Sequence, residues 1–225
     1  MSLLSERDRQ TVQSHLAGLT HDVTLLFFTQ TIAAPETALI ARQVVDEVAG
    51  LSDRVSVEEV NLILDREKSA QYGIDRIPAI VLLRDGADTR MRFLGAPAGY
   101  EFTSLIQAVL LVGGRASTLS PESLSLVAAV DSPLTVRVFT TPTCPHCPRA
   151  VSVAHEMAFA NPNITAYAVE ATEFPDLARR YHVTGVPKTV VNDAANASEA
   201  IEILGALPPD DFVSQALAGF SNRPL

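Results

Sequence analysis

The feature that most constrains the fold of this chain is an internal repeat with a period near 110 residues. Four short matches occur in the same order in both halves of the 225-residue sequence. Phe28-Thr29 recurs as Phe139-Thr140, Tyr72 to Pro78 as Tyr181 to Pro187, Leu94-Gly95-Ala96 as Leu204-Gly205-Ala206, and Phe102 as Phe212, at offsets of 111, 109, 110 and 110 residues. The sequence therefore predicts two copies of one unit, residues 1–115 and residues 116–225.

Each copy has the residue pattern of an α/β unit. Ser5 followed by Asp8 indicates a helix start in the first copy, and Ser120-Pro121 does so in the second. Apolar runs predict buried strands at 23–29 and 134–140. The other long elements are expected as helices at 35–49 and 148–160 and as strands at 55–61, 165–170, 80–83, 189–192, 90–94 and 199–204. Short helices complete the order helix, strand, helix, strand, helix, strand, strand, helix. This order predicts the α/β class, with two tandem folds whose mixed central sheets are flanked by helices.

Composition and charge narrow the partners. With 47% hydrophobic and 19% charged residues, the chain has the composition of a folded protein. Its formal net charge of −9 argues against nucleic acid as a partner. No apolar run approaches the roughly 18 residues of a membrane span, and the first residues lack the pattern of a signal peptide. We therefore expect a cytoplasmic protein that binds no nucleic acid and no membrane.

Both cysteines lie in one motif, Cys144-Pro145-His146-Cys147, which follows a predicted strand and opens a predicted helix. Unpaired backbone N–H groups and the helix dipole stabilise a thiolate there, and can lower a cysteine pKa from about 8.5 to roughly 3.5–7.5. His146 can add positive charge beside Cys144, and Pro145 removes an N–H where a helix begins at no cost. A second cysteine one turn later can close a disulfide. The motif therefore predicts dithiol exchange, in which Cys144 attacks and Cys147 resolves.

These residues resemble the thioredoxin family, in which a strand, a Cys-x-x-Cys motif and a helix are followed by a hydrophobic residue and proline, here Val186-Pro187, before another strand. In that family the proline is cis and faces the disulfide, and the backbone beside it pairs with the substrate. Because Pro78 and Pro187 occupy matching places in the two copies, we expect a cis bond before both. The tandem arrangement is similar to the two-fold, glutaredoxin-like protein disulfide oxidoreductases. It is also similar to the N-terminal domain of the flavoprotein component of alkyl hydroperoxide reductase.

The resemblance implies an enzyme, a protein disulfide oxidoreductase that needs no cofactor or metal. Since no flavin domain follows in the sequence, the resemblance implies a freestanding form served by a separate flavoprotein disulfide reductase that uses a nicotinamide cofactor. Protein disulfides or a peroxiredoxin would be the acceptors. We expect residues 1–115 to act as scaffold and docking surface, with the two sheets packed into one continuous unit.

The sequence departs from the family pattern in two places. In the first copy, Ala33 and Glu36 stand where Cys144 and Cys147 are in the second, so no exchange chemistry is expected there. In the second copy, the strand before the motif lacks the buried acidic residue that is usual in thioredoxins, and this leaves the proton acceptor for the resolving thiol open.

Other uses of the cysteine pair stay open. A zinc site needs four ligands, and besides the pair only His146, His155 and His182 are candidates. Iron–sulfur binding through Cys144 is disfavoured because Pro145 stiffens the loop and no glutathione-binding pattern is evident. A redox-regulated binding module should reduce insulin slowly. A disulfide-forming oxidase or isomerase is a further alternative, and a reduction potential near about −270 mV would indicate a reductase, whereas one near about −120 mV would indicate an oxidant.

Overall fold

A computed structural model describes residues 4–193, 200–218 and 220 of the chain. The predicted order of eight elements occurs twice. The first half contains α1 (Glu6–Leu16), β1 (Val23–Thr29), α2 (Glu36–Ala49), β2 (Val55–Asn61), α3 (Arg66–Gln71), β3 (Ala79–Arg84), β4 (Ala87–Leu94) and α4 (Glu101–Val112). The second contains α5 (Pro121–Ala128), β5 (Leu134–Thr140), α6 (Cys147–Ala160), β6 (Ile164–Glu170), α7 (Pro175–Arg180), β7 (Lys188–Asp193), β8 (Ile201–Leu204) and α8 (Pro209–Leu217).

The predicted helix starts are confirmed by their capping hydrogen bonds. The Ser5 hydroxyl accepts the backbone N–H of Asp8 at the start of α1, at 3.2 Å. The Ser120 hydroxyl accepts the N–H of Ser123 at the start of α5, at 3.1 Å. Strand β8 begins at Ile201; residue 199, where this strand was expected to start, lies outside the described residues.

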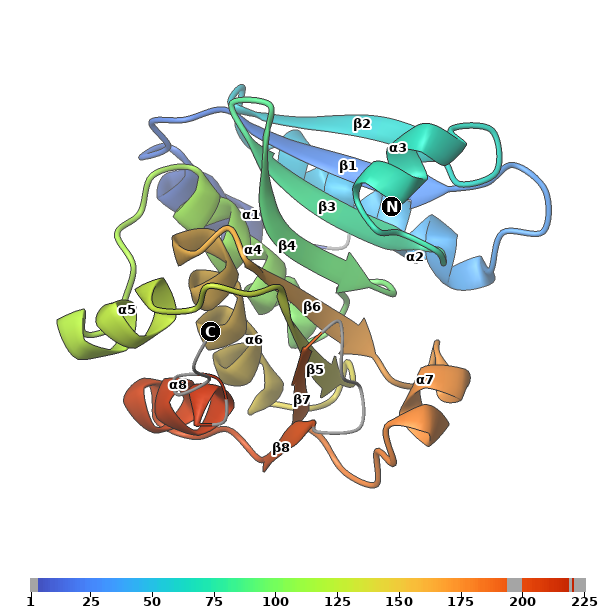
Figure 1. Ribbon diagram of the computed structural model, residues 1–225. Helices are drawn as coiled ribbons and strands as arrows, with labels where there is room; N and C mark the ends of the chain where they lie inside the picture. Colours follow the sequence, from blue (N-terminus) through green and yellow to red (C-terminus); the bar gives the residue numbers. More distant parts are fainter. Residues whose placement is uncertain (1–3, 194–199, 219, 221–225) are drawn as a thin grey trace.

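All the described strands belong to one sheet, in the order β2-β1-β3-β4-β6-β5-β7-β8 (Figure 1). The cysteine motif follows β5, and the equivalent residues 33–36 of the first half follow β1. Strand β1 pairs in parallel with β2 and antiparallel with β3, and β5 likewise pairs in parallel with β6 and antiparallel with β7. The halves meet where β4 runs parallel to β6, with Met91 opposite Ala166 and Leu94 opposite Val169. The expected continuous unit is therefore confirmed. Backbone hydrogen bonds between β4 and β6 join the strands of the two halves into one sheet.

Helices cover both faces of the sheet, and alternate residues of each strand point to opposite faces. Val23, Leu25 and Phe27 of β1 belong to a core shared with α1, α2, α4, α5, α6 and α8. Leu26 and Phe28 belong to a smaller core on the other face, which α3 and α7 cover with the loops that follow them (Figure 1). Both cores draw residues from both halves, so the two copies share their interior.

Polar contacts fix the connection between the halves. The buried Glu156 carboxylate of α6 accepts hydrogen bonds from the Ser117 hydroxyl and from the Thr118 N–H, each at 2.6 Å. The Arg90 guanidinium of β4 donates to the Ala158 carbonyl near the end of α6, at 2.9 and 3.1 Å. The predicted boundary between residues 115 and 116 falls in this loop between α4 and α5, and it stays a prediction.

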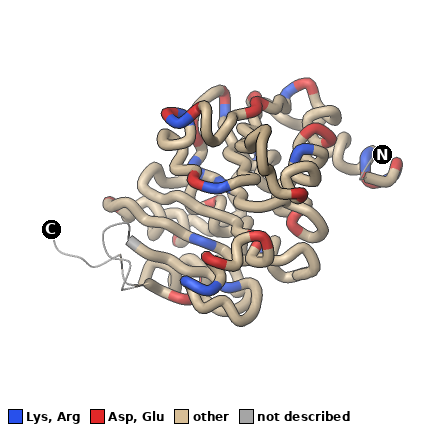
Figure 2. Tube along the Cα trace, turned by 90° about the vertical axis from the view of Figure 1, so that its right-hand side faces the viewer, with Lys and Arg blue, Asp and Glu red and all other residues tan. Residues whose placement is uncertain are grey.

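Charges of both signs are interspersed along the chain. Figure 2 shows Lys and Arg residues scattered among Asp and Glu residues. Within the described part of the chain, none of the helices has the length and apolar character required to span a membrane.

Candidate redox site

The cysteine motif lies between the end of β5 at Thr140 and the start of α6 at Cys147. Cys144 and Cys147 form a disulfide, with their Cα atoms 5.5 Å apart. Cys147 is the first residue of α6 and fully buried, whereas Cys144 is 7% exposed. Pro145 and His146 between them are exposed. Cys144 is therefore the sulfur that an incoming disulfide reaches first, which agrees with the predicted order of attack; the roles themselves stay predictions.

Both expected cis bonds are present, at Ile77–Pro78 and Val186–Pro187. Strand β7 starts directly after Pro187 and pairs antiparallel with β5, with Lys188 opposite Phe139. Pro187 therefore lies beside the end of β5, from which the cysteine loop leaves. On its other side, the Gly205 N–H donates to the Pro187 carbonyl at 2.9 Å.

A turn of the first half packs against the cysteine loop. The Tyr100 N–H donates to the Pro142 carbonyl at 2.9 Å. Gly99 has a φ of +60°, and a Cβ atom there would lie 2.2 Å from the same oxygen, so only glycine permits this approach. Residues 99–101 therefore border the redox site although they belong to the copy without cysteines.

Glu101 follows this turn as the first residue of α4 and is only 2% exposed. Its carboxylate lies beside the Ser104 side chain, and no hydrogen bond of regular geometry reaches either oxygen from the described residues. Burial, and secondarily the nearby Glu170 carboxylate, raise the pKa of Glu101 to about 7. Helix α4 packs against α6, which starts with Cys147. A carboxyl that titrates near neutral pH is thus held in the protein interior close to the cysteine loop.

Glu101 could not be identified from the sequence, because the buried acid of thioredoxins is expected in the strand before the motif. The carboxylate comes from the other half of the chain. An acidic residue in the first turn of a helix is ordinary, since it complements the helix dipole. The second copy has Asp211 at the equivalent place, and that residue is exposed. Burial alone distinguishes Glu101, and burial follows from the packing of the two halves.

Two further carboxylates lie at the same end of the sheet. Glu170 ends β6 and accepts the Glu173 N–H at 2.6 Å and the Thr172 hydroxyl. Glu173 in turn accepts the Ala96 N–H at 2.7 Å, and burial raises its pKa. Both are tied into the backbone of the loops where β4 and β6 end.

The equivalent place in the first half has a different form. Ala33 is exposed and has a φ of +57°, and Glu36 is the exposed first residue of α2. The loop borders an apolar hollow of about 170 Å³. Its lining residues are Gln30, Thr31, Ile32, Asn61, Ile63 and Leu64. As expected, this half has no group for thiol exchange at the motif position.

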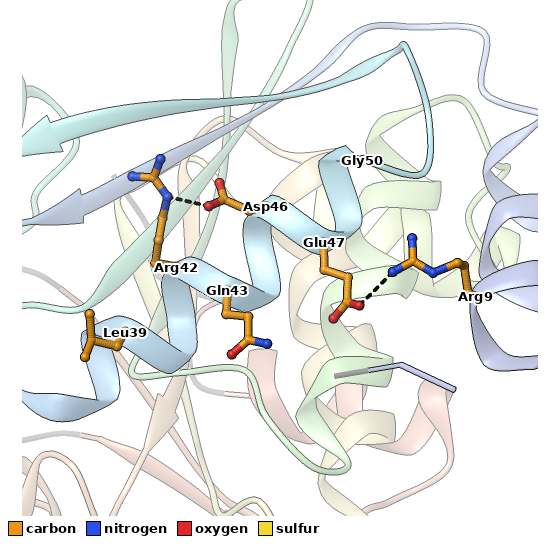
Figure 3. Close-up of a pocket in the computed structure, with 7 residues that line it drawn as sticks. All are labelled: Arg9, Leu39, Arg42, Gln43, Asp46, Glu47 and Gly50. Atoms are coloured by element: carbon orange, nitrogen blue, oxygen red, sulfur yellow. Dashed lines mark hydrogen bonds and ion pairs between the residues drawn. The ribbon is translucent and has the colours of Figure 1, made fainter. Parts of the chain in front are cut away.

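The outer side of α2 is open to solvent. A hollow of about 580 Å³ lies between α1 and α2 (Figure 3). It holds two ion pairs, Arg9 with Glu47 at 2.9 Å and Arg42 with Asp46 at 2.7 Å. The charges in this hollow are therefore neutralised by one another.

Of the three histidines considered for a zinc site, His146 and His182 are exposed, whereas His155 lies in the core. His155 is 2% exposed, stacks edge-on against Phe93 at 4.9 Å, and has its pKa lowered to about 4 by burial. Its Nε2 lies 3.3 Å from the Arg92 carbonyl oxygen. In the part of the chain that the structure describes, there is no cluster of three or more His, Cys, Asp or Glu residues that could hold a metal ion.

Comparisons with known proteins agree with this geometry. Residues 134–218 match the family model described as Thioredoxin domain. The alkyl hydroperoxide reductase AhpF of Pseudomonas putida is 31% identical over 185 residues, which are 77% of this chain and 36% of that protein. An NADH dehydrogenase of Bacillus subtilis is 30% identical over 148 residues, or 66% of this chain and 27% of that protein. The chain thus spans about a third of the length of such relatives.

Solved structures extend the likeness to both halves. The NTD_N/C domain of alkylhydroperoxide reductase AhpF from Enterococcus faecalis superposes with a TM-score of 0.84 at 27% identity, covering 94% of this chain and 98% of that one. A protein disulfide oxidoreductase from Aeropyrum pernix K1 shares the fold, with a TM-score of 0.85 at 24% identity and 96% and 93% coverage.

A thioredoxin fold that carries a Cys-x-x-Cys disulfide at the start of a helix defines the class: the chain is a thioredoxin-fold disulfide oxidoreductase. Within this class it is a tandem, glutaredoxin-like form with the cysteine pair in the second fold. It is similar to the N-terminal domain of the alkyl hydroperoxide reductase AhpF.

Proposed function

We propose that the chain carries electrons by dithiol–disulfide exchange through Cys144 and Cys147, from a flavoprotein disulfide reductase to protein disulfides or to a peroxiredoxin. The observation that carries this proposal is the disulfide at the start of α6, whose Cys144 sulfur is the more exposed of the two. The relatives named as the alkyl hydroperoxide reductase AhpF support this class of partners. We place the reaction in the cytoplasm.

In the first step, the Cys144 thiolate attacks one sulfur of a substrate disulfide. The substrate S–S bond breaks, and its other sulfur leaves as a thiolate that takes up a proton. Backbone N–H groups at the start of α6 stabilise the attacking thiolate, and His146 adds positive charge when protonated. Pro145 shapes the turn between the cysteines, and the backbone of Val186 beside Pro187 pairs with the substrate.

In the second step, Cys147 gives up its proton and attacks the Cys144 sulfur of the mixed disulfide. The Cys144–Cys147 bond forms, and the substrate leaves as a second thiolate, now reduced by two electrons. Because Cys147 is fully buried, its proton needs an acceptor inside the protein. Glu101 suits this role, since it is buried at the start of α4, which packs against α6, and its pKa of about 7 lets it take and release a proton at neutral pH. The flavoprotein reductase then returns two electrons to the pair.

Trapping with the Cys147→Ser variant tests the proposal. Without the resolving thiol, the mixed disulfide at Cys144 should accumulate, and mass spectrometry should identify the captured proteins as a flavoprotein reductase and as disulfide substrates. The Cys144→Ser variant is the matched control and should capture neither. Recovery of neither class by Cys147→Ser would contradict the electron-transfer role. Slow reduction of insulin by the unaltered chain would favour a redox-regulated binding module, and a reduction potential near about −120 mV would favour an oxidase.

A further inference from the structure

We infer that Tyr100, a residue of the half without cysteines, forms part of the surface that holds a polypeptide substrate against Cys144. This inference rests on the proposed function. It assigns to the first half a direct contact with the substrate of the second.

Tyr100 and Pro187 lie on opposite sides of the cysteine loop. The sheet order β4-β6-β5-β7 places β5, from which the loop leaves, between β6 and β7. Pro187 immediately precedes β7 on one side. On the other side, the turn after β4 reaches across the end of β6, and the Tyr100 N–H binds the Pro142 carbonyl two residues before Cys144.

The Tyr100 side chain is free to make such a contact. It is 50% exposed, and among the described residues its ring takes part in no aromatic or cation–π pair. The other tyrosines differ: Tyr72, Tyr167 and Tyr181 are buried or half-buried, and each lies against an arginine guanidinium. An exposed tyrosine offers a large contact area at low conformational cost, which is why this residue type recurs in binding surfaces.

The internal repeat shows that the aromatic residue is peculiar to this position. The offset of 110 places Asp210 opposite Tyr100, and the Asp210 carboxylate accepts hydrogen bonds from the Ser120 and Ser123 hydroxyls at 2.7 and 2.6 Å. That acid fixes α5 against α8, whereas Tyr100 bonds no other side chain among the described residues. The aromatic ring therefore occurs only in the copy of this turn that borders the disulfide.

The same repeat shows that the Tyr100 turn covers a position that is open in the first half. The offset of 111 places Thr31 opposite Pro142, and Thr31 lines the open hollow of the first half. In the second half, the Gly99–Glu101 turn covers Pro142 instead. One side of the redox site is thus formed by the first half, and the exposed side chain on that side is Tyr100. A polypeptide with an apolar residue near its disulfide would bind there, whereas a small disulfide would not reach the ring.

The test compares a protein disulfide with a small one. Pre-reduced protein is mixed with insulin or with 2-hydroxyethyl disulfide, and the second-order rate constant for loss of each disulfide is measured. Loss of an aromatic contact in Tyr100→Ala should slow insulin reduction by about fivefold to tenfold. The rate with 2-hydroxyethyl disulfide and the reduction potential of the cysteine pair should stay unchanged. Tyr100→Phe keeps the ring and should keep the insulin rate.

The matched control is Leu39→Ala, which removes a side chain of the first half that is 76% exposed and lies on α2. It should leave both rates unchanged. Equal slowing of both substrates by Tyr100→Ala would mean a structural role and would overturn the inference, as would an unchanged insulin rate. An unaltered chain that reduces neither disulfide would instead contradict the proposed function.

Discussion

The two halves have the same eight elements in the same order, yet the helices at their motif positions have different surroundings. Helix α6 buries nine of its fourteen residues, among them Cys147, and packs against α4 and α8. Helix α2 buries five of fourteen and leaves one side to solvent (Figure 3). The helix with the cysteine thus lies in the middle of the molecule, where the other copy can reach it.

This difference supports the proposal that the redox site includes groups of the first half. The first half has neither sulfur, but its turn after β4 contacts the cysteine loop of the second half through the Tyr100 N–H, and Glu101 follows Tyr100 in the chain. Under the proposed function, the first copy is therefore not idle. We propose that the first copy supplies Glu101 and Tyr100 to the redox site. These two residues make the expected role of the first copy as scaffold and docking surface specific.

The sharpest way to break the comparison is to move the cysteine pair. Cys144→Ser should lower insulin reduction by at least about 1000-fold, because the attacking sulfur is gone. Adding Ala33→Cys and Glu36→Cys to a Cys144→Ser/Cys147→Ser background should restore less than about 1% of the activity, an estimate based on backbone strain at functional sites. Ala33 is in the left-handed region, whereas Cys144 is not, so the transplanted pair meets another loop conformation. Substantial recovery in the insulin assay would show that the motif position alone suffices.

The next largest effect should come from the acceptor that the first half contributes. Glu101→Gln removes the proton acceptor but keeps the shape of the side chain, so release of the mixed disulfide by Cys147 should slow on the order of 100-fold at pH 8. Stopped-flow measurement with a chromophoric disulfide separates this step from the attack by Cys144, which should be unaffected. In the unaltered chain the release rate should rise with pH through about 7, as the carboxyl deprotonates. If the release rate changes neither with the substitution nor with pH, Glu101 is not the proton acceptor.

Separating the halves sharpens the comparison through stability. Residues 116–225 alone should keep the potential of the cysteine pair roughly unchanged. They should lose at least about 3 kcal/mol of unfolding free energy, since each large apolar side chain that becomes uncovered costs about 1.5–3 kcal/mol. The loss has a structural cause, because β6 loses its partner β4 and α6 loses its contact with α4. Urea unfolding of the oxidised fragment and of the oxidised full chain measures this loss. Equal unfolding midpoints would mean that the first half does not stabilise the second.

The smallest expected effect concerns the pH dependence of stability. Burial raises the pKa of Glu101 from about 4.5 to about 7 in the folded state, so the folded state holds a proton that the unfolded state releases between these values. Stability from this group is present below about pH 4.5 and is lost as the pH rises through 7. Glu101→Gln should therefore stabilise the oxidised protein at pH 8 by at most about 3 kcal/mol relative to its effect at pH 4.5. Equal effects at both pH values would show that the carboxyl is not shifted.

Much of this architecture could be predicted from the sequence because it is local. Apolar β-branched runs, the serine caps and the repeat offset predict elements whose bounds differ from the observed ones by few residues. The offset of 111 correctly places Glu36 and Cys147 at the starts of equivalent helices. The two cis bonds were also predictable, since the hydrophobic residue and proline recur in both copies.

The features that depend on how the halves meet could not be predicted in the same way. The pairing of β4 with β6 could not be predicted, because neither ADTRMRFL nor ITAYAVE has a residue pattern that selects one particular neighbour strand. Burial of Glu101 follows only from that pairing and from the packing of α4 on α6. The position of Tyr100 depends on a single backbone contact with Pro142, which no residue pattern indicates.

The parallel joint between β4 and β6 also bears on synthesis of the chain. When the ribosome has released the first half, β4 is complete but its partner, Ile164–Glu170, has not yet been made. Until about 55 further residues emerge, β4 presents an unpaired edge beside an apolar core, the kind of edge that recruits strands from other chains. The nascent first half therefore exposes a strand edge that β6 covers in the complete fold.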